Sequence, residues 1–320
     1  MTALVVVERT PDGIHDLSLQ AIAFARAYVA TEPVDALVVG RSDGLEAVLG
    51  EHGVSTVHVA QHEAFSSYAP AAVARAALDV MGRTATSAVV AAGNERGNEV
   101  LAHVAAIAGV PFAANCLEAT AGEPALVTRV RWGGSLLEEA RLHGSPALMT
   151  VQPHSVAPEA VAGEPARVER FNPELTEADL AVHVHERVGA ATGGVSLADA
   201  KVVVSCGRGA GSPEGFGIIE ELAGLLGGAV GCSRAVTMAG WRPHTDQVGQ
   251  TGTKIAPDIY IACGISGATQ HMAGCKGAKA ILAVNTDPEA PILASADYAV
   301  IGDLHEVVPA ISAELRKARG

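Results

Sequence analysis

The sequence has little positive charge and few aromatic residues. Its 320 residues include 22 Lys and Arg against 35 Asp and Glu, which gives a net charge of 22 − 35 = −13. This balance argues against binding to a nucleic-acid backbone, which needs concentrated Lys and Arg, and against adsorption to an anionic membrane. Aromatic residues make up only 3% of the chain, so we do not expect a binding cage built from aromatic rings.

Long apolar runs and paired cysteines are also missing. The longest uncharged apolar stretches, such as 104–116, are broken by glycine and proline and fall short of the ~20 residues that span a bilayer. The start of the chain lacks the basic region of a signal peptide. Five widely spaced cysteines without a CxxC motif argue against a disulfide framework or an iron–sulfur cluster and are expected to pack as small hydrophobic residues. We therefore expect a cytoplasmic, reducing location.

Hydrophobic residues make up 49% of the chain and recur in short runs that alternate with helical patterns. Such alternation is typical of a parallel sheet with helices on both faces. In the first half the pattern predicts two helices, over Leu17–Tyr28 and Pro70–Met81, and a third after the polar turn Gly93–Asn98. The predicted strands there are Ala3–Val7, Ala36–Val39, Thr56–Ala60 and Ala88–Ala92.

From Ala125 the pattern changes to short strands joined by glycines. Three of them, Ala125–Val130, Ser135–Leu142 and Pro146–Val151, predict an antiparallel addition to the sheet. A further strand is expected over Leu180–His185. His183 and His185 could be two metal ligands on one strand face, but no third ligand is spaced nearby, so a metal site is not expected.

A second α/β unit follows a small, glycine-rich stretch that predicts a linker over 189–199. We therefore expect an α/β protein with two α/β domains, residues 1–188 and residues 200–320, the second with a doubly wound parallel sheet. Helices are expected over Gly215–Leu226 and over His305–Arg319, the latter interrupted early by Pro309. The predicted strands are Val202–Cys206, Ala229–Val230, Ile259–Cys263, Ala280–Val284 and Tyr298–Ile301.

Glycine-rich loops follow two of these strands. Gly207–Gly211 lies between a strand and a helix, where backbone amides and a helix amino terminus favour a phosphate group. Its G-x-G-x-G spacing differs from the dinucleotide fingerprint, so an ordinary tight turn explains it equally well. Ser266–His271 follows the strand Ile259–Cys263 and opens a helix, where Gln270 and His271 could donate to a ligand. His271 could equally be a helix cap or a core residue.

Two further polar loops complete the set of candidates. In Gly231–Arg234 an arginine among small residues suits a phosphate or an electron-rich ring, although a salt-bridged surface arginine is the plain alternative. Gln247–Gly252 offers two amides and a hydroxyl, or is an ordinary turn. No matched acid–base pair accompanies these loops, which is typical of a protein that holds a cofactor and leaves the chemistry to it.

Taken in order, these loops carry a family resemblance. Gly207-Arg-Gly209, Gly231-Cys-Ser-Arg234, Gln247-Val-Gly-Gln-Thr-Gly252 and the run from Tyr260 to His271 are followed by Asn285–Pro291 and Asp297-Tyr298. The series resembles the α subunit of electron transfer flavoprotein, strongly over about 201–306 and more weakly in the first half. Thr269, where that family usually has a branched aliphatic residue, and the order Thr253-Lys254 depart from its pattern.

The resemblance implies a heterodimer with an electron transfer flavoprotein β subunit, against which residues 1–188 would pack. It implies that residues 200–320 bind FAD and that AMP is held by the β subunit. Electrons would pass one at a time from acyl-CoA dehydrogenases and similar flavoenzymes to a membrane quinone oxidoreductase, as in fatty acid β-oxidation. The chain would thus be an electron carrier without substrate turnover of its own, and not itself embedded in a membrane.

The resemblance also implies the residues that contact FAD. Thr251 would lie near the flavin N5, His271 near the C2 carbonyl oxygen and Arg234 beside the ring, while Asn285 and Asp303 would serve the adenosine end. The full set is Arg208, Ser233, Arg234, Gln247, Val248, Gly249, Gln250, Thr251, Ser266, Gly267, Ala268, Thr269, Gln270, His271, Asn285, Asp303 and Leu304.

Three other functions stay open at this point. An electron-bifurcating relative would hold a second FAD in the partner subunit. A nicotinamide-dependent dehydrogenase would need a ribose-binding acid and a proton-relay residue, and the sequence offers neither. A nucleotide-binding module of the stress-response kind would use the α/β pattern of the first domain, and bound flavin would exclude it.

Overall fold

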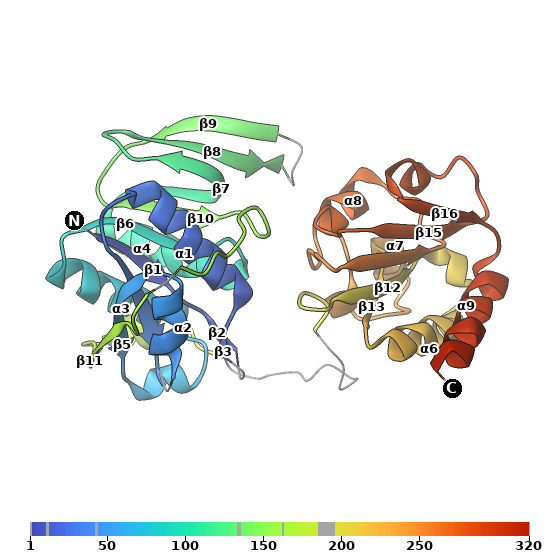
Figure 1. Cartoon of the computed structure of the whole chain (residues 1–320), viewed down its shortest axis with the longest axis horizontal. Helices are drawn as coiled ribbons and strands as arrows, with labels where there is room; N and C mark the ends of the chain where they lie inside the picture. The colour runs from blue at the N-terminus through green and yellow to red at the C-terminus, as the bar shows by residue number, and fades with distance from the viewer. Residues whose placement is uncertain are drawn as a thin grey trace. The chain divides into compact units, whose positions relative to one another are not determined.

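The structure is a computed structural model that describes residues 2–10, 13–41, 44–132, 136–161, 163–184 and 196–319. It divides the chain into two compact units, Met1–Arg187 and Val188–Gly320. Each unit has its own sheet (Figure 1). Each also has its own hydrophobic cores. No described helix is long and apolar enough to cross a membrane.

In the described residues of the first unit, nine strands form one sheet in the order β11-β5-β4-β1-β6-β10-β7-β8-β9. Every neighbouring pair from β11 to β7 is parallel. The four strands predicted first are confirmed, each extended or shifted by one or two residues. In chain order the strands are β1 (Thr2–Val6), β4 (Val34–Val39), β5 (Val54–Ala60), β6 (Thr86–Ala92), β7 (Phe112–Thr120), β8 (Ala125–Arg131), β9 (Leu136–Leu142), β10 (Ala147–Val151) and β11 (Arg167–Phe171). A separate short hairpin joins β2 (Arg9–Thr10) to β3 (Gly13–Ile14).

Helices cover both faces of this sheet. On one face α1 (Asp16–Val29) and α2 (Leu45–Glu51) bury apolar side chains against it. On the other face α3 (Pro70–Arg83) and α4 (Glu95–Ala108) do the same. The helix expected after Gly93–Asn98 begins within that turn, because the Asn94 side chain accepts a hydrogen bond from the Gly97 amide and caps the helix. The short 3₁₀ turn η1 (Glu63–Ser66) precedes α3.

The antiparallel addition is partly as predicted. The pairs β7–β8 and β8–β9 are antiparallel. The prediction is wrong for Pro146–Val151, because β10 lies between β6 and β7 and is parallel to both. All five residues of β10 are buried, as is typical of a parallel strand covered on both faces. The sequence analysis also missed β7, β11 and α2.

The strand expected over Leu180–His185 is wrong. The structure has a helix, α5 (Glu177–Leu180), that ends where the strand was expected to begin, and His185 lies outside the described residues. A capping box explains the helix, since the Thr176 side chain accepts from the Asp179 amide while the Asp179 carboxylate accepts from the Thr176 amide. Asp179 also pairs with Arg75 of α3, which anchors α5 to the first unit.

The second unit has a parallel five-stranded sheet in the order β13-β12-β14-β15-β16 among its described residues. This order is that of a doubly wound sheet, as expected. Three predicted strands have the observed bounds and the other two differ at their ends. The strands are β12 (Val202–Cys206), β13 (Ala229–Cys232), β14 (Ile259–Cys263), β15 (Ile281–Asn285) and β16 (Tyr298–Ile301).

Helices pack on both faces of the second sheet. On one face lie α6 (Gly217–Leu226) and α9 (Leu304–Arg319), and on the other lies α8 (Thr269–Cys275). The predicted interruption at Pro309 is wrong, because α9 runs through it. Burial of Val308 on the same helix offsets the one hydrogen bond that proline removes. Short elements between them are η3 (Arg208–Ala210), η4 (Glu214–Phe216), α7 (Arg234–Met238), η5 (His244–Asp246) and η6 (Pro291–Ser295).

Most of the predicted linker, 189–195, lies outside the described residues. Its last part is described, and there Leu197 packs against the core of the second unit. The extent of the linker stays a prediction.

Candidate functional site

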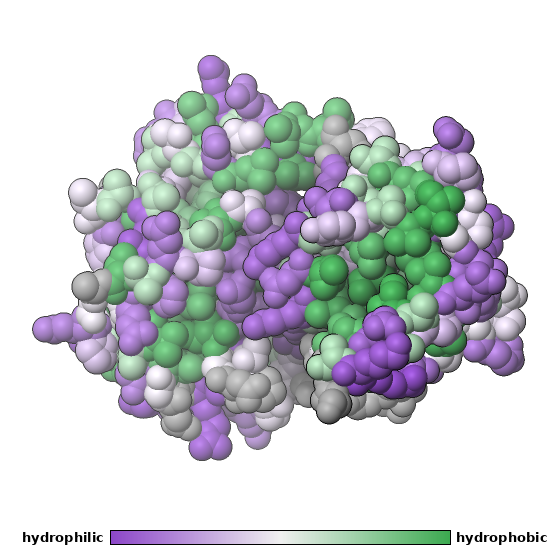
Figure 2. Space-filling model, turned by 45° about the vertical axis from the view of Figure 1, so that its right-hand side comes forward, coloured by the Kyte–Doolittle hydropathy of each residue, from purple (hydrophilic) through white to green (hydrophobic). Residues whose placement is uncertain are grey.

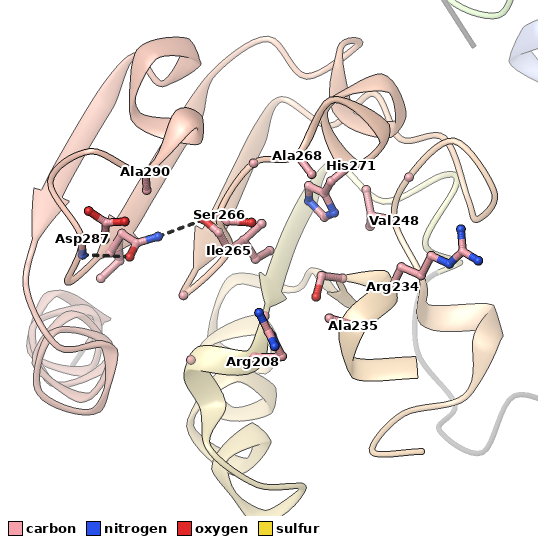
Figure 3. Close-up of a pocket in the computed structure, with 18 of the residues that line it drawn as sticks. Arg208, Arg234, Ala235, Val248, Ile265, Ser266, Ala268, His271, Asp287 and Ala290 are labelled. Atoms are coloured by element: carbon pink, nitrogen blue, oxygen red, sulfur yellow. Dashed lines mark hydrogen bonds between the residues drawn. The ribbon is translucent and has the colours of Figure 1, made fainter. Parts of the chain in front are cut away.

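The carboxyl edge of the second sheet borders a cavity of about 460 Å³. Its walls are the loops that follow β12, β13, β14, β15 and β16. In a doubly wound sheet, ligands bind where the strand order reverses, which here is between β12 and β14. The volume falls in the range of roughly 300–1,000 Å³ that holds cofactors and other small molecules. Figure 3 shows side chains from these separate loops gathered around one space.

The loop after β12 brings a cation to the cavity. A Cβ atom on Gly207 would lie 2.2 Å from the carbonyl oxygen of Gly264, so only glycine lets these two loops approach each other. The next residue, Arg208, is exposed and rises from η3 towards the cavity (Figure 3). No carboxylate within the described ranges pairs with its guanidinium, which therefore suits a phosphate or another anion.

The loop after β13 brings a hydroxyl and a second cation. Ser233 is the residue before α7, yet its side chain makes no capping hydrogen bond and stays available to a ligand. Arg234, the first residue of α7, is exposed at the rim of the cavity and reaches outwards (Figure 3). These two residues place a donor and a positive charge at one end of the cavity.

Gln247 lines the cavity, but its side chain is hydrogen-bonded to other residues of the protein. It is 2% exposed, its side-chain oxygen accepts from the Thr237 hydroxyl at 2.7 Å, and its side-chain nitrogen donates to the Thr251 hydroxyl at 3.0 Å. Both ends of the amide are thus engaged within the protein. Because Thr251 accepts this bond, its own hydroxyl hydrogen is free for a ligand.

His271 points from α8 into the cavity (Figure 3). Its Nε2 atom lies 2.7 Å from the hydroxyl oxygen of Tyr260, while Nδ1 is buried and has no hydrogen-bond partner among the described residues. Burial lowers the pKa of His271 to about 4, and the backbone of Val248 offsets this only in part. At pH 7 the imidazole is therefore neutral, so His271 offers a hydrogen bond rather than a positive charge.

The polar residues at the β15 and β16 ends of the cavity already have backbone partners. The Asn285 side chain donates to the Ile265 carbonyl at 2.9 Å and accepts from the Asp287 amide at 3.0 Å. The Asp303 carboxylate accepts from the His305 amide at 2.9 Å, which caps α9. These groups shape the loops, and they lack the geometry of a general base paired with an acid.

All the predicted cofactor residues except Thr269 line this one cavity. Thr269 is the exposed first residue of α8 and does not border the cavity. The other lining residues were outside the predicted set of FAD contacts. All of them except Ala290 stand within two positions of a residue in that set, and Ala290 lies in the run Asn285–Pro291 that carried the resemblance, so these were the signals that could have found them. They are Gly207, Gly209, Ala235, Gly264, Ile265, Val284, Thr286, Asp287, Ala290 and Gly302.

Comparison with known families agrees with the two-unit organisation. The family model described as Electron transfer flavoprotein domain matches residues 3–176, and that described as Electron transfer flavoprotein FAD-binding domain matches residues 196–276. The chain belongs to the electron transfer flavoprotein α-subunit family. It is therefore an electron carrier, and its second unit is the FAD-binding domain of that family.

Relatives named electron transfer flavoprotein subunit alpha are similar over most of their length. The protein from Mycobacterium leprae is 36% identical over 99% of both chains, and that from Syntrophomonas wolfei is 34% identical over 98% of both. The protein from Thermoanaerobacterium thermosaccharolyticum is 34% identical over 89% of this chain and 88% of its own. The resemblance stated from the sequence is thus confirmed.

The residues around the cavity fit FAD. Two guanidinium groups without a carboxylate partner among the described residues suit its pyrophosphate and its electron-rich ring, and glycines let backbone approach a ligand closely. The buried Nδ1 of His271 lacks a partner that a flavin carbonyl could supply. When bound, FAD supplies the redox chemistry, and the protein supplies orientation and electrostatics. The individual FAD contacts remain predictions.

The cysteines take no part in this site. All five are buried free thiols, as expected of small hydrophobic residues. Four lie on strands and Cys275 ends α8. Burial raises the pKa of Cys206 and Cys232 to about 12, so both stay protonated and unreactive at neutral pH. No group of three His, Cys, Asp or Glu side chains in the described residues could hold a metal ion.

Proposed function

We propose that this α subunit shuttles electrons one at a time between flavoenzymes. The donors would be acyl-CoA dehydrogenases and similar flavoenzymes of fatty acid β-oxidation, and the acceptor would be a membrane quinone oxidoreductase. The observation that carries the proposal is a cavity lined by hydrogen-bond donors and cations but without a paired acid and base. Such a cavity can tune a redox cofactor and offers no machinery for proton transfer to a substrate.

The FAD contacts belong to the proposal, with the roles that the family resemblance implies. Arg208 would meet the pyrophosphate, Arg234 would lie by the ring, and Asn285 and Asp303 would bracket the adenosine end. His271 acts here as a neutral donor, because its imidazole is uncharged at pH 7. The preference for a reduced ring would then come from a hydrogen bond and from the nearby arginine charge, each of about 1–3 kcal/mol.

A β subunit is the proposed partner of the first unit, residues 1–188, with AMP held on the partner's side. The support is that the antiparallel end of the sheet exposes four large apolar side chains, Leu126, Trp132, Leu136 and Leu137, which are 52–77% exposed. On the face drawn in Figure 2, hydrophobic side chains reach the surface in patches between hydrophilic ones. Exposed apolar surface of this kind favours a protein interface. The linker 189–199 would let the FAD domain turn towards different partners. The proposed location of the protein is the cytoplasm.

The test is an absorption spectrum of the chain co-purified with its β subunit, followed during stepwise anaerobic reduction. We expect one FAD per heterodimer and two resolved one-electron steps. Addition of a reduced acyl-CoA dehydrogenase should then reduce the FAD, and a quinone oxidoreductase should reoxidise it.

Other results would change the proposal. Two flavins per heterodimer, with electrons split between two acceptors, would indicate a bifurcating protein. A folded complex without flavin would overturn the shuttle and favour a nucleotide-binding module.

A further inference from the structure

Tyr260 stands behind His271 as seen from the cavity. It lies on β14 and is 0% exposed, so its hydroxyl has no access to water. It does not border the cavity, whereas His271 does. The hydroxyl oxygen lies 2.7 Å from Nε2 of His271, which is a short and well-formed hydrogen bond. A fully buried tyrosine that meets a cavity residue in this way controls that residue rather than a ligand.

The direction of this hydrogen bond follows from an account of donors and acceptors. Burial raises the pKa of Tyr260 well above 10, so the phenol keeps its hydrogen. The neutral imidazole carries one hydrogen, on either Nε2 or Nδ1. If Nε2 carried it, the Tyr260 hydroxyl would have to donate to the nearby Ser205 hydroxyl. Ser205 instead lowers the pKa of Tyr260, against the larger effect of burial, as a hydroxyl that donates to the phenol oxygen does.

The opposite arrangement agrees with this effect of Ser205. When Tyr260 donates to Nε2, its hydrogen is used and the imidazole hydrogen resides on Nδ1. The backbone of Val248 faces the ring in a way that favours a hydrogen on it. The buried Nδ1–H then has no hydrogen-bond partner among the described residues, which is unfavourable unless an acceptor meets it. A ligand acceptor in the cavity would satisfy it.

We propose that Tyr260 is a positioning residue that fixes the tautomer of His271, so that the imidazole presents an N–H donor, and not a lone pair, to the bound cofactor. A donor stabilises an oxygen that gains negative charge, whereas a lone pair would repel it. Tyr260 itself loses and gains neither a proton nor an electron. The consequence for electron transfer rests on the proposed function, but the tautomer does not.

The first test reads the tautomer directly. The chain is labelled with ¹⁵N-histidine and assembled with an unlabelled β subunit and FAD, and two-bond ¹H–¹⁵N correlations distinguish a hydrogen on Nδ1 from one on Nε2. The signal of His271 is the one lost in His271→Gln. We expect Nδ1–H in the oxidised complex at pH 7. Detection of Nε2–H would overturn the proposal, whatever the complex does with electrons.

The second test removes the hydroxyl with Tyr260→Phe. The loss should release the constraint, so that His271 shows a mixture of both tautomers. The potential of the first one-electron step should fall by about 59 mV, which is a tenfold weaker preference for the reduced flavin. FAD content should stay at the wild-type level. The matched control is Tyr28→Phe, a buried tyrosine of the first unit, which should change neither quantity.

The outcomes separate the two proposals. An unchanged Nδ1–H signal and an unchanged potential in Tyr260→Phe would show that Tyr260 only fills space. A changed tautomer with an unchanged potential would overturn its role in tuning. If Tyr260→Phe fails to assemble, the wild-type tautomer still decides the assignment. Failure of the electron shuttle itself would appear as missing flavin or missing donors in the wild-type complex.

Discussion

The two units show how one architecture can be closed or open to a ligand. In both, the carboxyl ends of parallel strands border a cavity, of about 250 Å³ in the first unit and about 460 Å³ in the second. In the first, the polar groups pair with one another: Glu8 accepts from Asn94 at 2.7 Å and from Arg96 at 2.8 Å, and Tyr68 donates to Glu99 at 2.8 Å.

In the second unit the corresponding edge is left unpaired. Arg208 and Arg234 have no carboxylate partner in the described part of the chain, and the buried Nδ1 of His271 has no hydrogen-bond partner. Each such open group costs free energy in the empty protein, which a ligand recovers on binding. Binding capacity therefore follows from which polar groups remain unpaired rather than from the topology of the sheet.

The largest expected effect comes from adding one methyl group to a loop that lines the open cavity. At Gly267, φ is +84° and a Cβ atom would lie 2.5 Å from the Ile292 amide nitrogen. Gly267→Ala therefore combines backbone strain with overpacking and should cost about 3 kcal/mol in the loop conformation. We expect the affinity for FAD to fall more than a hundredfold, measured by equilibrium dialysis of the complex.

The control for this prediction is Gly224→Ala on the exposed side of α6, where a Cβ atom meets nothing within 4 Å. This change should leave FAD affinity unaltered and stabilise the helix by about 0.5–1 kcal/mol. Equal FAD affinity in Gly267→Ala and wild type would show that the glycine loop is not part of the binding surface.

The second prediction compares two arginines, one at the cavity of the second unit and one at the cavity of the first. Arg208→Ala should weaken FAD binding by about 2 kcal/mol, close to thirtyfold, because a charge-assisted hydrogen bond is lost. Arg96→Ala should leave FAD binding unchanged and lower the free energy of unfolding by less than about 1 kcal/mol, since its pair with Glu8 is half exposed. Titration calorimetry and denaturant unfolding measure the two effects. A loss of FAD affinity in Arg96→Ala would contradict the contrast.

The third prediction concerns acid. The pKa of His271 is about 4 in the folded chain and about 6.5 in the unfolded chain. Between these values the unfolded chain binds more protons, so stability is complete above pH 6.5 and is lost as the pH falls towards 4. The group should account for about 2 kcal/mol of the loss between pH 7 and pH 5.

Denaturant unfolding of the complex at both pH values measures this loss. His271→Gln should lose about 2 kcal/mol less than the wild type, whereas the exposed control His143→Gln should lose as much as the wild type does. If His271→Gln lost as much unfolding free energy between pH 7 and pH 5 as the wild type, the imidazole would already be solvated in the folded protein.

Sequence patterns located most of the strands because buried parallel strands are short apolar runs. Val202–Cys206 and Ile259–Cys263 were found with their observed bounds. Strand β10 was predicted in the wrong position and direction, since nothing in its local sequence distinguishes an antiparallel edge strand from a parallel strand inside the sheet. Helix α5 was missed although its capping residues Thr176 and Asp179 stood in the sequence.

The amino-acid sequence by itself determined the two α/β units, the loops at the carboxyl ends of the strands and the family, because these depend on local pattern and residue identity. Only the tertiary structure decided which groups are engaged. In the structure the Gln247 amide is hydrogen-bonded to Thr237 and Thr251, and Tyr260 is hydrogen-bonded to His271. Hydrogen-bond partners and burial come from residues distant in the chain, and they set whether a side chain is a charge, a donor or a support.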